Sequence, residues 1–86
     1  MDTNFSLFNQ INSLSYWLLN HSEYRTSVVL DAENDIYSLS VKKAGIELFA
    51  NCIKGFSKRN PKFLEPELDM MVASLLNIKQ RVSKTS

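Results

Sequence analysis

Residues 25–40 read RTSVVLDAENDIYSLS, and their conformation decides the fold of this 86-residue chain. A β-branched, apolar run at 26–30 is followed by turn-forming residues at 31–35 and by renewed apolar character at 36–39. This order is typical of a strand, a short loop and a second strand. The sequence therefore predicts a β-hairpin at about 26–39.

A helix is the competing interpretation of the same stretch. Apolar residues recur there at helical spacing, at Val28, Ala32, Ile36 and Leu39. The residues at 34–35, Asn and Asp, would then lie in the middle of a helix, where both are unfavourable. We favour the hairpin, and the helix stays open as the alternative.

The preceding segment, residues 3–22, contains no Asp, Glu, Lys or Arg, although eleven of its twenty residues are polar. Its apolar residues predict a helix over about 4–21, because they fall on one stripe: Leu7, Phe8, Ile11, Leu14, Leu18 and Leu19. Solvated helices usually carry charge, whereas the centres of protein–protein contacts are depleted of it. We therefore expect this helix to pack against protein on more than one side.

Two further helices are predicted after the hairpin. The first begins at Ser40 and ends near 57–59, because Asn60-Pro61 disfavours continuation. Its apolar face comprises Val41, Ala44, Leu48, Phe49, Cys52, Ile53 and Phe56, which makes Cys52 a small buried side chain. The second begins near Glu65 and ends in a frayed tail at 83–86.

The expected architecture is a single α+β domain over residues 1–86, in the order α-β-β-α-α. The hairpin at about 26–39 would pack on three helices, because an isolated two-stranded ribbon is only marginally stable. If residues 25–40 are helical, the chain is instead an all-α four-helix bundle.

The single cysteine excludes an intramolecular disulfide and, with only one histidine, leaves no zinc constellation. We expect no metal and no cofactor. Small domains without a disulfide or a structural metal often gain stability by self-association, so we expect a homodimer. No leader peptide or membrane span fits the sequence, and the lone cysteine favours a reducing compartment. We expect a cytoplasmic protein without a membrane contact.

Four large side chains depart from the apolar faces of the predicted helices: Phe5, Tyr16, Trp17 and Met70. Trp and Tyr dominate binding hot spots, and methionine adapts to irregular contacts. We expect these four residues to contact a protein partner or a second copy of the chain. The alternative for Trp17 is that its own monomer covers it.

Basic residues concentrate in the middle of the chain. Residues 40–62 hold six Lys or Arg and one Glu, a net charge of +5, whereas residues 1–39 hold one Arg and five acids, a net charge of −4. The candidates for contact with nucleic acid or an acidic partner are Lys43, Lys54, Lys58, Arg59 and Lys62. A solvated helix face is the favoured explanation of these residues, because Glu47 interrupts the face and the pI near 7.9 is low for a DNA-binding domain.

Catalysis has little support, because the sequence contains neither a glycine-rich phosphate loop nor a pattern of paired carboxylates. We expect no catalytic residue. Chains of this size without such chemistry are common among bacterial and phage-encoded regulators and inhibitors. The sequence therefore predicts a small regulatory, inhibitor or adaptor protein that binds another protein. The alternative is a nucleic-acid-binding transcriptional regulator that uses the basic face of the helix predicted after Ser40.

Overall fold

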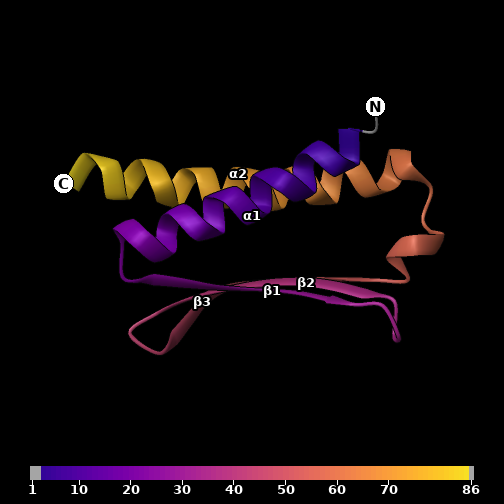
Figure 1. Cartoon of the computed structure of the whole chain (residues 1–86), viewed down its shortest axis with the longest axis horizontal. Helices are drawn as coiled ribbons and strands as arrows, with labels where there is room; N and C mark the ends of the chain where they lie inside the picture. Colours follow the sequence, from indigo (N-terminus) through magenta and orange to yellow (C-terminus); the bar gives the residue numbers. More distant parts are fainter. Residues whose placement is uncertain (1–2, 86) are drawn as a thin grey trace.

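The computed structural model describes residues 3–85, which form two helices and a three-stranded antiparallel sheet. The elements are α1 (Thr3–His21), β1 (Tyr24–Asp31), β2 (Ile36–Lys43), β3 (Ile46–Lys54), the short 3-10 helix η1 (Phe56–Lys58) and α2 (Pro61–Thr85). Both helices cover one face of the sheet and run in the same direction, and none of the described helices or strands lies on the other face (Figure 1). The predicted α+β class is confirmed, but neither the three-helix packing nor the four-helix bundle is observed.

The hairpin predicted at about 26–39 lies within β1 and β2, which pair from Tyr24 opposite Lys43 to Asp31 opposite Ile36. The connecting loop is closed by side chains. Asp31 accepts hydrogen bonds from the backbone N–H of Asn34 at 3.1 Å and from its amide group at 2.8 Å. These bonds hold the pKa of the Asp31 carboxyl below its ordinary value, the side-chain bond contributing most.

The helix predicted from Ser40 to about residue 58 is wrong. That stretch contains the end of β2, a two-residue turn at Ala44 and Gly45, the whole of β3, and η1. Both turn residues have positive φ, 53° and 79°, as type I′ hairpin turns require. The apolar residues at helical spacing misled the prediction, because Val41, Phe49 and Ile53 also fit one face of a paired hairpin.

Helix α2 begins earlier than the predicted start near Glu65. The side chain of Asn60 accepts a hydrogen bond from the backbone N–H of Lys62 at 3.0 Å, and Pro61 occupies the first helical position. Asn at the cap and Pro at the first position are typical of a helix start. The dipeptide that was expected to end one helix therefore begins another. Helix α2 continues to Thr85, and Ser86 lies outside the described residues.

The core lies between the helices and the covered face of the sheet. Strand β2 alternates strictly, with Tyr37, Leu39 and Val41 buried and their neighbours more exposed. The other buried apolar residues are Leu7, Ile11, Leu14, Leu18, Ile53, Leu64, Leu68, Met71, Val72 and Leu75. Cys52 is exposed, contrary to expectation. It precedes the buried Ile53 on β3, and successive residues of a strand point to opposite faces, so Cys52 lies on the face away from the core.

Candidate protein-binding groove

A wide hollow runs between α1 and the edge strand β1. Its volume is about 570 Å³, and it is lined by Phe5, Phe8, Asn12, Val28, Leu30, Tyr37 and Phe56. A second hollow of about 290 Å³ shares Asn12 and Val28 with the first, and is otherwise lined by Ser15, Tyr16, Leu19, Arg25 and Thr26. The two hollows adjoin at Asn12 and Val28, and we refer to them together as the α1–β1 groove.

Large apolar side chains stand exposed along both walls of the α1–β1 groove. On α1, Phe5 is 64% exposed and Tyr16 is 69% exposed, and on β1, Leu30 is 60% exposed. Leu19 adds a further half-exposed side chain at the α1 wall. Scattered exposed apolar residues are ordinary, but a contiguous set that lines one groove is typical of an interaction site.

The floor at the Phe5 end is a cluster of three aromatic rings. The centroid of Phe8 lies 5.0 Å from that of Tyr37 and 6.5 Å from that of Phe56, and both pairs meet edge to face. Burial raises the pKa of the Tyr37 hydroxyl, because the ionised phenolate would lose hydration there. Because the three rings hold one another in place, they form a rigid apolar surface. Such a surface loses little conformational entropy when a ligand packs on it.

The polar character of the groove comes almost entirely from neutral groups. Arg25 is the one charged residue among its lining side chains, and it donates hydrogen bonds to the backbone carbonyls of Ser22 at 2.7 Å and Tyr24 at 2.9 Å. The buried hydroxyl of Ser15 has no hydrogen-bond partner among residues 3–85. Within residues 3–85, strand β1 pairs only with β2, so its other edge presents backbone groups that no described strand pairs.

The four expected contact residues are divided between three places. Phe5 and Tyr16 line the α1–β1 groove. Trp17 is partly buried within the monomer, where it stacks on His21 with ring centroids 4.5 Å apart and lies beneath the amine of Lys79 at 5.1 Å. Met70 is exposed on α2. The structure therefore joins Phe5 and Tyr16 in one surface, but not Trp17 or Met70.

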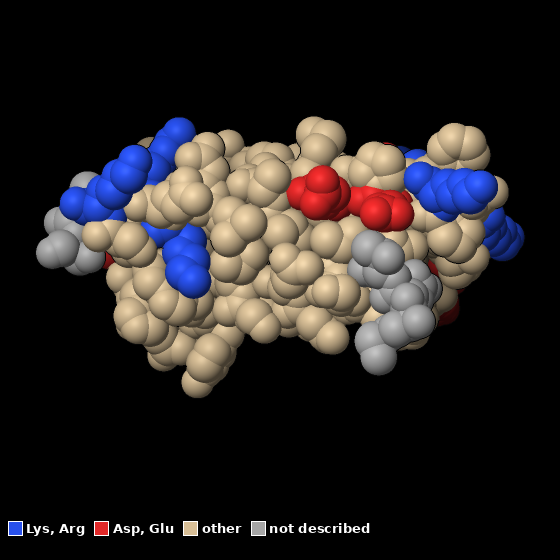
Figure 2. Space-filling model, turned by 90° about the horizontal axis from the view of Figure 1, so that it is seen from above, with Lys and Arg blue, Asp and Glu red and all other residues tan. Residues whose placement is uncertain are grey.

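The helix face predicted to carry Lys43, Lys54 and Lys58 is wrong, because residues 40–58 form the end of β2, the strand β3 and η1 instead. Lys43 ends β2 beside Tyr24, whereas Lys54 lies opposite Ile36, at the other end of the sheet. Lys58, Arg59 and Lys62 follow Lys54 around η1, and Arg59 donates to the carboxylate of Glu67 at 2.6 Å. Figure 2 shows Lys and Arg at the two ends of the helix side, with acidic residues and a broad uncharged surface between them.

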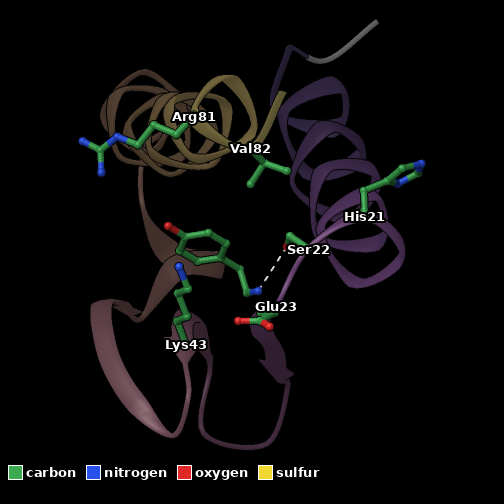
Figure 3. A pocket seen from close by; sticks show the side chains of 7 residues that line it. His21, Ser22, Glu23, Lys43, Arg81 and Val82 are labelled. Atoms are coloured by element: carbon green, nitrogen blue, oxygen red, sulfur yellow. Dashed lines mark hydrogen bonds between the residues drawn. The ribbon is translucent and has the colours of Figure 1, made fainter. Parts of the chain in front are cut away.

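A third hollow of about 340 Å³ lies at the end of the sheet, lined by His21, Ser22, Glu23, Tyr24, Lys43, Arg81 and Val82. In Figure 3, Lys43 approaches it from the end of β2 and Glu23 lies in the connection between α1 and β1, whereas Arg81 and His21 point away from it. The amine of Lys43 lies 5.0 Å from the centroid of the Tyr24 ring. Because charges of both signs line this hollow and two of its polar groups face outward, it is a poorer candidate than the α1–β1 groove.

Sequence reasoning identified Phe5 and Tyr16 but missed Leu30, Val28 and Phe56 as members of the same surface. These three residues come from β1 and η1, and only the folded chain brings them beside α1. The one sequence feature that pointed to this surface was the lack of charge in α1. It indicated that a second side of the helix contacts protein, but it did not identify which segment or molecule makes that contact.

Among the described residues, no group of three or more His, Cys, Asp or Glu side chains could hold a metal ion. Neither helix within residues 3–85 combines the length and apolar character needed to cross a bilayer. No protein-family model, curated protein or solved structure matches the chain at a significant level.

Proposed function

We propose that this protein is a non-enzymatic binding module, of the regulator, inhibitor or adaptor kind, that takes an extended apolar segment of a partner protein into the α1–β1 groove. The observation that carries the proposal is the exposure of Phe5, Tyr16 and Leu30 on the two walls of one uncharged groove beside an open strand edge. An extended segment can pair with such an edge through its backbone and place alternate side chains against the adjoining apolar wall.

Each part of the groove has a role in this mode of binding. The free backbone groups of β1 supply hydrogen bonds that do not depend on the sequence of the segment. The rings of Phe8, Tyr37 and Phe56 form a firm apolar floor, and the exposed ring of Tyr16 is suited to close over a bound side chain. Selectivity would come from the apolar residues of the segment, because the only cation in the groove is already bonded to backbone carbonyls.

The test uses random twelve-residue peptides displayed on phage and selected against the immobilised chain. We expect the enriched peptides to carry apolar residues at alternate positions. Synthetic fluorescent copies should lose at least about tenfold in affinity for Leu30→Asp and Tyr16→Asp, because each places a charge in the apolar groove. Leu76→Asp is the matched control, since Leu76 is also exposed but lies on α2.

Two outcomes would contradict the proposal. One is a selection that enriches no peptide family. The other is an enriched peptide that binds Leu30→Asp as tightly as the unaltered chain. A salt titration adds an independent measure, because an apolar contact responds weakly to ionic strength, whereas phosphate binding falls steeply with it.

A further inference from the structure

The backbone of β1 shows which of its groups face the edge away from β2. The N–H of Tyr24 donates to the hydroxyl of Ser22 at 3.1 Å, and the carbonyl of Tyr24 accepts a hydrogen bond from Arg25 at 2.9 Å. Tyr24 therefore turns both groups away from β2. Because residues of an antiparallel pair bond to the partner strand at every second position, three further residues turn both groups to this edge: Thr26, Val28 and Leu30.

The same three residues direct their side chains into the α1–β1 groove, because alternate residues of a strand share a face. Thr26 and Val28 line its smaller hollow, and Val28 and Leu30 line its larger hollow. A segment that pairs with β1 places the residues opposite these three on the same face. The groove therefore contacts three alternate positions of a bound segment, and the residues between them point to the other face of the sheet.

The position opposite Leu30 is suited to a large apolar side chain. It opens on the hollow of about 570 Å³, whose floor is the cluster of three aromatic rings and whose wall is the exposed ring of Phe5. The position opposite Thr26 opens on the hollow of about 290 Å³, where Tyr16 and Leu19 form the wall. Both ends of the groove therefore favour apolar residues, and the Leu30 end accepts the larger one.

The middle of the groove is polar. Asn12, which lines both hollows together with Val28, is exposed, and its amide can donate and accept hydrogen bonds. One helical turn further on, the buried hydroxyl of Ser15 lines the smaller hollow and has no hydrogen-bond partner among residues 3–85. An apolar residue opposite Val28 would cover these groups without bonding to them, at a cost in free energy. An uncharged polar residue, such as asparagine or glutamine, would satisfy them.

We propose that the segment bound in the α1–β1 groove runs antiparallel to β1 and presents a large apolar residue, an uncharged polar residue and a second apolar residue at three alternate positions, in that order from its N-terminus. This inference rests on the proposed function, because it specifies the segment that the groove accepts. An antiparallel segment passes Leu30 first and Thr26 last, which sets the order. The antiparallel direction is favoured because such pairing is slightly more stable per residue than parallel pairing.

The experiment measures binding of fluorescein-labelled peptides to the whole chain by fluorescence anisotropy. The reference peptide carries the core Phe-Thr-Asn-Thr-Leu between flanking Gly-Ser pairs, with threonine at the two positions that point away from the groove. We expect the reversed core, Leu-Thr-Asn-Thr-Phe, to bind about tenfold more weakly, because it places the larger ring in the smaller hollow. We expect Phe-Thr-Leu-Thr-Leu to bind about fivefold more weakly, since it covers Asn12 without a hydrogen bond. Equal affinities of the three peptides overturn the proposed pattern.

N-methylation of the peptide tests the backbone pairing without altering the protein. The N–H of the central asparagine should point to the carbonyl of Val28, whereas the N–H of the threonine after it should point away from β1. N-methylation of the central asparagine should therefore lower the affinity at least about tenfold, and N-methylation of the following threonine should change it little. Equal effects of the two modifications overturn the pairing with β1.

Asn12→Leu tests the middle position from the protein side. This variant should reverse the preference, so that Phe-Thr-Leu-Thr-Leu binds more tightly than the reference peptide. The matched control is Asn9→Leu, since Asn9 is also an exposed residue of α1 but lines a hollow between α1 and α2. Circular dichroism confirms that both variants fold. A reversal with Asn9→Leu, or none with Asn12→Leu, overturns the role of Asn12.

The outcomes separate this inference from the proposed function. If the reference peptide binds and Leu30→Asp weakens it, but peptide order, N-methylation and Asn12→Leu make no difference, only this inference is overturned. The same holds if peptides selected on phage bind in the groove and lack the pattern. If neither the reference peptide nor any selected peptide binds, the proposed function fails, and this inference fails with it.

Discussion

Asp35 and Ser57 join two turns that are 22 residues apart in the chain. The carboxylate of Asp35 accepts a hydrogen bond from the backbone N–H of Ser57 at 3.1 Å and from its hydroxyl at 2.8 Å. The backbone carbonyl of Asp35 also accepts the N–H of Gly55 at 2.7 Å. The β1–β2 loop thereby fixes the position of η1, and η1 carries the Phe56 ring that lines the α1–β1 groove.

The first prediction concerns this link. Asp35→Ala should lower the free energy of unfolding by about 1–2 kcal/mol, because it removes both side-chain bonds and leaves alanine at a φ of 56°. Asp35→Asn retains an acceptor and tolerates positive φ, so its loss should be smaller. Urea denaturation measures both. The control is Glu33→Ala in the same exposed loop, and an equal loss for Glu33→Ala would refute the role of the link.

The turn between β2 and β3 gives a pair of opposite predictions. Ala44→Asn should raise the free energy of unfolding by about 0.5–1 kcal/mol, because asparagine tolerates the φ of 53° better than alanine and Asn-Gly favours this turn. Gly45→Ala should lower it by about 1 kcal/mol through its φ of 79°, since an added Cβ meets no atom within 4 Å. Thermal unfolding measures whether each variant raises or lowers the stability of the fold. Two shifts of the same sign would contradict this account of the turn.

The two faces of the sheet should respond differently to truncation. Leu39 is 1% exposed beneath the helices, so Leu39→Ala should cost about 2–5 kcal/mol of unfolding free energy through lost burial and an unfilled cavity. Val29, on the face of the sheet opposite the helices, is 48% exposed, so Val29→Ala should cost less than about 0.5 kcal/mol. The measurement is chemical denaturation. A large loss of unfolding free energy for Val29→Ala would mean that this face of the sheet is covered.

The buried side chain of Tyr37 predicts a dependence on alkaline pH. Burial raises its pKa from the ordinary value of 10.0, so the folded state favours the protonated phenol. This stability is fully present below the pKa of the unfolded chain and is lost as pH rises through the raised pKa of the folded state. Tyr37→Phe should remove that component. The measurement is the difference in unfolding free energy between the unaltered chain and Tyr37→Phe, taken at pH 8 and again above pH 10. If this difference is the same at both pH values, Tyr37 is not the source of the alkaline pH dependence.

The sequence by itself determined those features that depend on local patterns. The stripe from Leu7 to Leu18 specified α1 almost to its observed bounds, and the turn formers at 31–35 separated two strands correctly. Local spacing could not distinguish a helix from a hairpin after Ser40. Val41, Phe49 and Ile53 suit both periodicities, and the positive φ values at Ala44 and Gly45 become evident only in the folded turn.

Tertiary structure alone decided the surfaces. The lack of charge in α1 indicated a covered flank, but only packing against β1 set Phe5 and Tyr16 opposite Leu30. The physical reason is range: a helix is selected by neighbours within one or two turns, whereas a groove or a sheet face joins residues whose proximity depends on the whole chain.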